Sequence, residues 1–391
     1  MVSSFKIIAV MGYESCYGAE KANLQVLSLL REGGAQIHCL VRSDGTGENF
    51  IRVATERGFA VRPAGFGPSI FGLHGNVFQY LSNAAGMVSV SLTLIRLRKQ
   101  VGATHIYIPN YLQFLYCWPA VLLLRLPVVF RIGDPPEKSS LHRHLWTKII
   151  APCVSQFVTN SEFTRQRLIS VCGRPIRSRV IKNCITPRSE AVEGMTESKR
   201  WKSAPMITYL GQMNASKGVD LAVDAAIQIC KSLENVCFQF VGLMEPASDF
   251  VEGLRNRIGK AGMSERIAFR PYVSDVMTSL RGSILHLCPS VQDESSANVV
   301  LDAKQAGVPS IVFPRGGLPE LVTHQVDGYV CGSADAAGLI EGILCFLDDR
   351  VSWAQASDAA MESAAQYSPA AILPKWQKAF EECADRQNCI M

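Results

Sequence analysis

Short apolar runs alternate with longer amphipathic segments along most of the chain. The run at residues 5–10 predicts a buried strand, and residues 18–32 carry apolar side chains at helical spacing. A glycine pair ends this helix, and residues 36–41 have the composition of a second strand. Strand, loop, helix and strand in this order form one βαβ unit, so the first half is predicted to build a parallel sheet.

The same alternation continues to about residue 185. Further strands are predicted at 60–63, 105–108, 128–132, 157–159 and 180–182. Helices are predicted at 77–100, 112–124 and 162–170, the last with Ser161 as its N-cap. The polar stretch 186–205 has proline near both ends and no apolar period, which is typical of an interdomain connection.

Strand–helix alternation restarts after this stretch. Strands are predicted at 206–210, 236–241, 267–270, 284–287 and 310–313. Helices are predicted at 219–233, 250–261, 273–280 and 297–306, with another beginning at Pro319-Glu320 and a last one at 356–383 that breaks near 367–369. The prediction is an α/β protein with a Rossmann-like domain at 1–185, a connection at 186–205, a second Rossmann-like domain at 206–365 and a helical segment at 366–391.

Composition is consistent with two globular domains. The chain has 391 residues, of which 48% are hydrophobic. Its 13 cysteines form no CxxC pair and no cluster at metal-ligand spacing, which favours reduced thiols in a cytosolic protein. Proline and arginine interrupt the apolar stretch 114–130, which favours a helix and a strand over a membrane span. Gly12 and Glu14 follow the first apolar run at once, which favours a strand over a signal peptide.

The net charge of +5 is unevenly distributed. Residues 1–185 hold 21 Lys and Arg against 9 Asp and Glu, a balance of +12, whereas residues 186–391 hold 18 against 25, a balance of −7. A basic first half suggests an anionic partner, such as a phosphorylated acceptor or a membrane surface, but a merely solvated basic surface is an equal alternative. No nucleic-acid-binding motif is present.

Two loops of the first half are candidate ligand sites, because ligands bind at the carboxyl ends of parallel strands. One follows the first strand and contains Gly12, Glu14 and Gly18. The other is Gly133-Asp134, after the strand at 128–132. These residues could equally be ordinary turn formers, and no G-x-G-x-x-G fingerprint supports a dinucleotide.

The stretch 288–322 is the most informative in the second half. An acidic, serine-rich turn precedes the helix predicted at 297–306, and Gly316-Gly317 precedes the helix start predicted at Pro319. Helix N-termini beside small residues are favourable places for phosphate groups. Glu294 by itself could instead be a helix-start carboxylate, and Lys217 a solvated loop lysine.

Three features occur in fixed order in this half: Gly211 to Gly218 after a strand, Glu294 followed eight residues later by Asp302, and Gly316 to Glu320. Together they resemble the donor half of retaining glycosyltransferase family 4, the group 1 glycosyltransferases. The resemblance implies the GT-B architecture, in which two Rossmann-like domains face each other across a cleft. It also implies a C-terminal helix that packs back on the first domain.

The resemblance assigns roles to individual residues. Lys217 would neutralise the donor diphosphate, Glu294 would bind the hydroxyls of the donor sugar, and Asp302 would hold the ribose. The backbone at Ser296, Ala297 and Asn298 would meet the diphosphate. The other donor-binding candidates are Gly211, Gln212 and Gly317. The catalytic candidates are Glu294, Lys217 and Asp134, and the acceptor candidates are Gly12, Glu14 and Gly18.

Three positions depart from the family pattern. Gln212 stands where the family has an arginine, and Arg315 is the candidate that would compensate for the lost charge. Asp302 is one methylene shorter than the usual glutamate. Gly133-Asp134 replaces a His-Asp pair, so a catalytic histidine is absent there and Asp134 is a candidate acceptor contact.

The expectation is an enzyme that moves a sugar from a nucleotide diphosphate-sugar to a glycan or lipid-linked glycan, with retention and without metal or cofactor. The resemblance further implies polysaccharide assembly in the cytoplasm, with peripheral attachment to the inner face of the membrane. The alternatives are a non-catalytic GT-B protein that binds a nucleotide or a partner, and a sugar-nucleotide epimerase.

Overall fold

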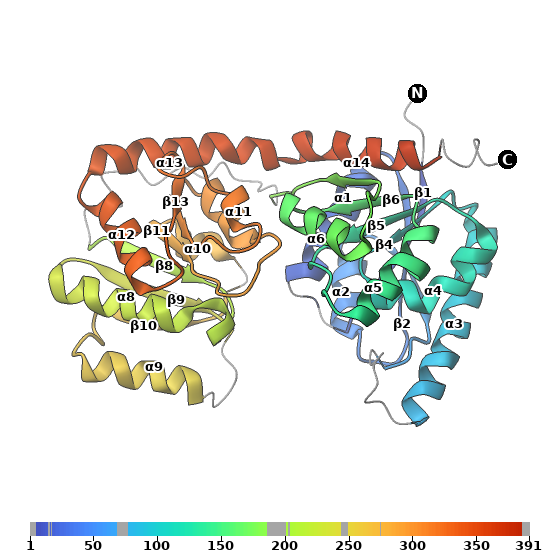
Figure 1. Cartoon of the computed structure of the whole chain (residues 1–391), viewed down its shortest axis with the longest axis horizontal. Helices are drawn as coiled ribbons and strands as arrows, with labels where there is room; N and C mark the ends of the chain where they lie inside the picture. The colour runs from blue at the N-terminus through green and yellow to red at the C-terminus, as the bar shows by residue number, and fades with distance from the viewer. Residues whose placement is uncertain are drawn as a thin grey trace. The chain divides into compact units, whose positions relative to one another are not determined.

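The computed structural model in Figure 1 describes most of the chain. The described residues are 5–14, 16, 18–68, 77–185, 201, 204–243, 249–273 and 275–384. They divide into two compact units, and the second unit is an insertion near the C-terminal end of the first. Unit 1 comprises Met1–Cys184 and Pro369–Met391, and unit 2 comprises Ile185–Ser368.

Unit 1 contains a seven-stranded sheet in the order β3-β2-β1-β4-β5-β6-β7. All of its strand pairs are parallel, and the register places Ile8 of β1 opposite His38 of β2 and Ile106 of β4. The strands are β1 (Lys6–Val10), β2 (Gln36–Arg42), β3 (Ala60–Ala64), β4 (His105–Ile108), β5 (Val128–Ile132), β6 (Gln156–Thr159) and β7 (Ser178–Val180).

Helices cover both faces of this sheet, because its central strands carry apolar residues on both sides. On one face pack α1 (Gly18–Glu32), α2 (Glu48–Glu56) and the C-terminal α14 (Pro369–Ala384). On the other face pack α3 (Val77–Val101), α4 (Tyr111–Leu124), the turns from α5 (Ser140–His144) to Cys153, and α6 (Glu162–Cys172). The predicted cap of α6 is confirmed, since Ser161 Oγ accepts a hydrogen bond from Thr164 N at 3.1 Å.

Unit 2 contains a six-stranded parallel sheet in the order β10-β9-β8-β11-β12-β13. The strands are β8 (Met206–Leu210), β9 (Cys237–Gly242), β10 (Ile267–Pro271), β11 (Ser283–Cys288), β12 (Ser310–Val312) and β13 (Gly328–Val330). The main core on one face joins the sheet to α8 (Val219–Ser232), α9 (Asp249–Lys260) and α12 (Ala336–Leu347). The other face holds α10 (Val276–Leu280) and α11 (Asn298–Gln305), and α13 (Arg350–Ala364) contacts α11 and α12.

The C-terminal helix α14 packs on unit 1, as the resemblance implied. Trp376 is buried beside Tyr107, with 6.1 Å between ring centroids, and His105 Nε2 lies 3.1 Å from the carbonyl oxygen of Phe380. Near the end of the helix, Glu382 forms an ion pair with Arg179. Apolar burial therefore fixes the middle of α14, and charge fixes its end.

One predicted helix is wrong. Leu318–Glu320 is a single 3₁₀ turn and no α-helix follows it. The chain turns away after Leu321, because Thr323 N donates to Asp327 Oδ1 at 2.8 Å instead of continuing a helical ladder. The sequence therefore contributes one helix N-terminus to this region, that of α11, rather than two.

Other predictions differ at their boundaries. The strand predicted at 180–182 is β7 at Ser178–Val180, and α13 begins at Arg350 rather than near residue 356. The helices α2 and α12 and the strand β13 were not predicted. Of the predicted connection 186–205, residues 186–200, 202 and 203 lie outside the described residues. Twelve cysteines in the described part of the chain are free thiols, eight of them buried. No helix in that part has the length and hydropathy that crossing a membrane requires.

Candidate functional site

Three loops meet at the carboxyl edge of the second sheet. They follow β8, β11 and β12. The backbone N–H groups of Val291 and Gln292 donate to the carbonyl oxygen of Ser216 at 3.1 and 3.2 Å. Gly317 N donates to the carbonyl oxygen of Glu294 at 2.6 Å. Main-chain hydrogen bonds therefore join the lysine loop, the acidic turn and the glycine pair that the sequence singled out.

Glycines make this close approach of backbones sterically feasible. Gly316 has a φ of +58°, and a Cβ built there would lie 2.2 Å from the carbonyl oxygen of Glu294. Gly218 has a φ of +67°, and its Cβ would lie 1.9 Å from the carbonyl oxygen of Pro289. Both distances are far inside van der Waals contact, so the acidic turn can lie between the two other loops only where both positions are glycine.

Lys217 and Glu294 form an ion pair at the junction of these loops. The carboxylate is 16% exposed and the lysine side chain 24% exposed, so the pair is sheltered but reachable. Glu294 Oε1 also accepts from Ser290 Oγ at 2.9 Å and from Gln292 Nε2 at 3.2 Å. Oε1 therefore has three donors, whereas Oε2 has no hydrogen-bond partner among the described residues and is available to a ligand hydroxyl.

The N-terminus of α11 follows directly. Ala297 occupies the N-cap position and provides no side-chain oxygen to the first turn. Ser296 Oγ is buried and has no hydrogen-bond partner among the described residues. A helix end without a side-chain cap, beside an unpaired hydroxyl, offers donors to an anion.

Asp302 lies in the second turn of α11 and is half-buried, while Glu294 precedes the helix. The helix is held from behind by the buried ion pair of Lys304 with Asp327, in which the lysine is 1% exposed. Lys304 Nζ also donates to Ser363 Oγ of α13 at 2.9 Å. Burial lowers the pKa of Lys304, while the carboxylate of Asp327 opposes that shift.

The loop after β8 starts at Gly211, and its next residue shows the departure from the family pattern. The Gln212 side chain is exposed, and the backbone carbonyl oxygen of Gln212 accepts from Tyr209 Oη at 2.7 Å. Burial, and then the nearby Cys288 and Glu294, raise the pKa of Tyr209. Arg315 is exposed in the neighbouring loop, and its guanidinium has no ion-pair partner among the described residues.

The sequence did not single out Ser290 or Tyr209, although both support the site. Ser290 also donates to the carbonyl oxygen of Ser216 at 3.3 Å, so its hydroxyl contacts both the lysine loop and Glu294. A signal was present, because Ser290 follows Pro289 at the end of the buried strand β11.

The candidates of unit 1 lie along the carboxyl edge of the first sheet. Gly12 and Glu14 follow β1, Gly18 is the first residue of α1, and Asp134 follows β5 and is exposed. Glu14 Oε1 lies 3.4 Å from Nη1 of Arg42, which is buried. The side of Gly12 is filled by Phe66, whose ring would lie 2.4 Å from an added Cβ. Gly133 is anchored by Asn160, whose Nδ2 donates to its carbonyl oxygen at 3.1 Å.

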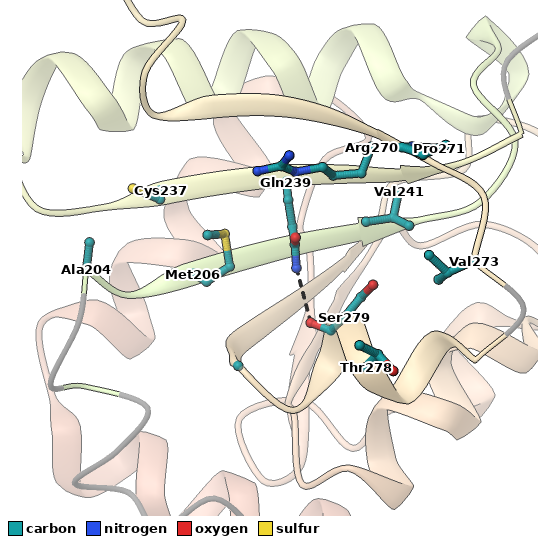
Figure 2. Close-up of a pocket in the computed structure, with 11 residues that line it drawn as sticks. Ala204, Met206, Cys237, Gln239, Val241, Arg270, Pro271, Val273, Thr278 and Ser279 are labelled. Carbon is teal, nitrogen blue, oxygen red and sulfur yellow. Dashed lines mark hydrogen bonds between the residues drawn. The ribbon is translucent and has the colours of Figure 1, made fainter.

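A separate groove lies on one face of the second sheet (Figure 2). It has a volume of about 580 Å³ and lies over β8, β9 and β10, with Met206, Cys237 and Val241 among its lining residues. The Gln239 side chain extends across the groove, and its Nε2 donates to the carbonyl oxygen of Ser279 at 3.1 Å. It shares no residue with the three loops, and Arg270 is its one charged lining residue. Within the described part of the chain, no group of His, Cys, Asp or Glu side chains could hold a metal ion.

Known proteins resemble this chain in sequence, chiefly in its second half. Residues 195–367 match the family "Glycosyl transferases group 1". The lipopolysaccharide core biosynthesis mannosyltransferase LpsB of Rhizobium meliloti (strain 1021) is 26% identical over 253 residues, which cover 61% of this chain and 68% of LpsB. A phosphatidyl-myo-inositol mannosyltransferase of Mycobacterium leprae (strain TN) is 22% identical over 181 residues, which cover 46% of each protein.

Solved structures share the fold over nearly the whole chain. HepE of Anabaena, crystallised with UDP and glucose, has a TM-score of 0.77 and 18% identity, with 96% of this chain and 99% of that chain covered. The lipopolysaccharide outer core galactosyltransferase WaaB has a TM-score of 0.71 and 12% identity, with 96% and 99% covered. At these identities the likeness concerns the fold.

Two Rossmann-like units, with a C-terminal helix on the first, are the GT-B fold. The second unit carries a domain of the group 1 glycosyltransferases, family 4, which the family match places at residues 195–367. The prediction of a retaining glycosyltransferase that uses a nucleotide sugar is thereby confirmed at the level of the family.

Proposed function

We propose that this enzyme binds a nucleotide diphosphate-sugar at the junction of residues 211–218, 288–298 and 315–320, and transfers a hexose to a glycan or lipid-linked glycan. The observation that carries the proposal is the Lys217–Glu294 pair, which three main-chain-linked loops place beside the N-terminus of α11. No other described part of unit 2 joins a sheltered lysine, a carboxylate oxygen without a partner and an uncapped helix start.

Charge explains how the diphosphate would be recognised. Negative charge grows on the leaving nucleoside diphosphate as the glycosidic bond breaks. Lys217 and the N–H groups at Ser296, Ala297 and Asn298 would stabilise that charge where it develops. Arg315, exposed beside Gly316 and Gly317, would supply the second positive charge that Gln212 lacks.

The two carboxylates would address different ends of the donor. Glu294 Oε2 would accept from the sugar hydroxyls, because Oε1 already has three donors. Asp302, in the second turn of α11, would accept from the ribose hydroxyls. When donor binds, the lysine would be shared between Glu294 and the diphosphate, so the existing ion pair pre-orients the cation.

The reaction would proceed on one face of the sugar. The bond from the anomeric carbon to the phosphate oxygen breaks, a bond to the acceptor oxygen forms on the same face, and the acceptor proton passes to the departing phosphate oxygen. The configuration is then retained without a protein nucleophile. The protein would supply position and charge stabilisation.

The acceptor would bind at the carboxyl edge of the first sheet, near Gly12, Glu14 and Gly18, with Asp134 as the contact closest to the reacting hydroxyl.

The names of the relatives mention mannose and galactose, and HepE was crystallised with UDP and glucose, which makes uridine and guanosine diphospho-hexoses the first donors to test. The basic balance of residues 1–185 supports an anionic partner, such as a membrane surface beside a lipid-linked acceptor.

The test is thermal stabilisation of the purified chain by a panel of nucleoside diphosphates and nucleotide sugars, followed by slow donor hydrolysis. We expect one diphosphate to raise the melting temperature. We expect Glu294→Gln to abolish hydrolysis while the nucleotide still stabilises the protein. No stabilisation by any nucleotide, or hydrolysis unchanged in Glu294→Gln, would refute the site.

The alternative function is a non-catalytic GT-B protein that binds a nucleotide. Gln212 and the Gly133-Asp134 pair favour it, because each lacks a group that the family uses. Stabilisation by nucleotides without hydrolysis of any nucleotide sugar would favour this alternative over the transferase.

A further inference from the structure

A buried arginine lies near the carboxyl edge of the first sheet. Arg131 is on β5 and is 3% exposed. Its Nη1 donates to Asn23 Oδ1 of α1 at 3.1 Å, and its Nη2 donates to Asn183 Oδ1, which follows β7, at 2.8 Å. Both partners are neutral amides, and no carboxylate of the described residues forms an ion pair with Arg131. A buried cation without a counter-ion costs stability, so its presence needs another reason.

The guanidinium determines which way the side chain of Asn23 is oriented. An arginine can only donate hydrogen bonds, so the atom of Asn23 that faces Arg131 is the amide oxygen. Tyr107 Oη donates to the same oxygen at 2.5 Å. The amide nitrogen therefore faces away from Arg131, where it donates to the carbonyl oxygen of Ala19 at 2.9 Å and to Tyr13 Oη at 3.0 Å.

Tyr13, in the loop after β1, is thereby left with a hydroxyl proton to donate. Its oxygen accepts from Asn23, and no acceptor for its own proton lies among the described residues. The ring is half-buried and packs against Phe50, with 5.5 Å between ring centroids, which holds the hydroxyl in place. Burial, and then the neighbouring Tyr107 and Glu20, raise the pKa of Tyr13 well above its ordinary value, so the hydroxyl stays protonated.

The charges around Tyr13 indicate what kind of ligand it would meet. The carboxylates of Glu20 and Asp134 both act electrostatically on its hydroxyl, Glu20 being half-buried and Asp134 exposed. Carboxylates accept hydrogen bonds from hydroxyl groups and repel phosphates. The cation of Arg131 is buried and bonded to two amides, so it is not presented to a ligand anion. One fixed donor beside two carboxylates therefore suits an uncharged sugar, whose hydroxyls both donate and accept, better than a phosphorylated ligand.

We propose that Tyr13 donates a hydrogen bond to an oxygen of an uncharged hexose unit of the acceptor, and that Arg131 and Asn23 are positioning residues that keep its proton available. The inference rests on the proposed function, because it concerns the edge of unit 1 at which the acceptor would bind. It also gives the reason for the uncompensated cation. An aspartate at the place of Asn23 would neutralise Arg131, but it has no N–H to donate and would accept the Tyr13 proton itself.

Asn23→Asp is the variant that separates positioning from stability. Its carboxylate gives Arg131 a counter-ion, so we expect the melting temperature to stay within about 4 °C of wild type although the bond to Ala19 is lost. The hydroxyl of Tyr13 must then donate to this carboxylate and is no longer available to a ligand. Hexoside binding should therefore fall as far as in Tyr13→Phe, which removes the hydroxyl. A merely structural role would instead lower stability and binding together.

Binding is measured by saturation-transfer NMR of the full chain with the methyl glycosides of mannose, glucose and galactose. Wild type should bind at least one of them, and Tyr13→Phe and Asn23→Asp should each weaken that binding by about three- to tenfold, the effect of one hydrogen bond. In transfer assays with the same hexoside and the most stabilising nucleotide sugar, the acceptor KM should rise by the same factor with little change in kcat.

Two further variants complete the test. Tyr13→Phe combined with Arg131→Met should bind hexosides like Tyr13→Phe alone, because Arg131 acts only through Tyr13. The matched control is Tyr329→Phe on unit 2, where the hydroxyl donates to Glu341 Oε1 at 2.8 Å, and it should bind hexosides like wild type. Every variant should keep the wild-type stabilisation by nucleoside diphosphates, since none lies in the three donor loops.

Several outcomes would overturn the proposal: no binding of any methyl hexoside to wild type, equal binding by wild type and Tyr13→Phe, or full binding by Asn23→Asp. Tighter binding of mannose 6-phosphate or glucose 6-phosphate than of the methyl hexosides would contradict the uncharged acceptor. Hexoside binding that depends on Tyr13, in a wild type that no nucleotide stabilises, would refute the donor site and leave the acceptor contact standing.

Discussion

At the scale of single residues, the site depends on glycines as much as on charges. Gly218 and Gly316 let two loops approach the acidic turn so closely that Lys217 reaches Glu294. The pair is then partly desolvated, which makes each charge more effective towards a ligand than it would be in water. Two glycine positions therefore determine where the side chains of Lys217 and Glu294 lie.

Replacement of one glycine tests this view. Gly316→Ala would place a Cβ 2.2 Å from the carbonyl oxygen of Glu294 at a φ of +58°, so we expect both strain and displacement of the acidic turn. The free energy of unfolding should fall by about 2–4 kcal/mol, and stabilisation by nucleotides should disappear. Urea unfolding and thermal shift measure the two effects.

The matched control for this substitution is Gly262→Ala. Gly262 has a φ of +71° but nothing within 4 Å of an added Cβ, so it carries the backbone strain alone. It should cost about 1 kcal/mol and leave nucleotide binding intact. Equal behaviour of the two variants would show that the contact with Glu294 has no special role.

The sequence could predict Lys217 and Glu294 because their spacing relative to the flanking strands and glycines is a pattern along the chain. It could not predict that Ser290 and Gln292 share Oε1 with Lys217, since that sharing depends on how the turn folds back. The order of motifs therefore indicates which residues form the site, and three-dimensional packing decides which carboxylate oxygen is available.

At the scale of elements, α11 joins the two ends of the proposed donor site. Its N-terminus follows Ser296, and Asp302 lies one turn further on. Behind it, Lys304 is 1% and Asp327 5% exposed, and Ser363 of α13 completes the contact. This buried pair fixes the position of the helix that carries the ligand groups.

Breaking the pair should be costly. Lys304→Met leaves Asp327 buried without its partner, and we expect the free energy of unfolding to fall by about 3–5 kcal/mol. The double variant with Asp327→Asn should recover most of that loss, because no uncompensated charge then stays buried. Urea unfolding of both variants measures the effect, and weaker nucleotide stabilisation should accompany the single variant.

An exposed ion pair provides the comparison. Arg257 and Asp224 are 41% and 40% exposed, so Arg257→Met should cost less than about 1 kcal/mol. A Lys304→Met variant as stable as Arg257→Met would contradict the positioning role of the buried pair.

The prediction of helices and strands mostly succeeded where the apolar periodicity was clear. It failed after Glu320, where local hydrogen bonds of polar groups determine the direction of the chain. The parallel strands other than β13, and the long helices α1, α3, α8 and α14, agree with the apolar pattern, whereas the apolar helix α12 was missed. Pro319-Glu320 also looked like a helix start, but the bond from Thr323 N to Asp327 Oδ1 ends the turn. That bond joins residues four apart through a side chain, and apolar spacing gives no sign of it.

At the scale of the whole molecule, each unit is a parallel sheet with its own cores, and α14 returns the chain to unit 1. The proposed donor site lies wholly within unit 2, so its three loops can be tested without reference to the other unit. The proposed acceptor edge belongs to unit 1.

The central claim is that Lys217 meets the diphosphate of the donor. The most direct measurement is calorimetric titration with the nucleoside diphosphate that stabilises the protein most, and with its monophosphate. Wild type should bind the diphosphate more tightly, by about tenfold or more, and Lys217→Met should lose that preference while its affinity for the monophosphate is unchanged. Lys231→Met, an exposed charge on α8, should behave like wild type. A Lys217→Met variant that keeps the full preference for the diphosphate would contradict the account.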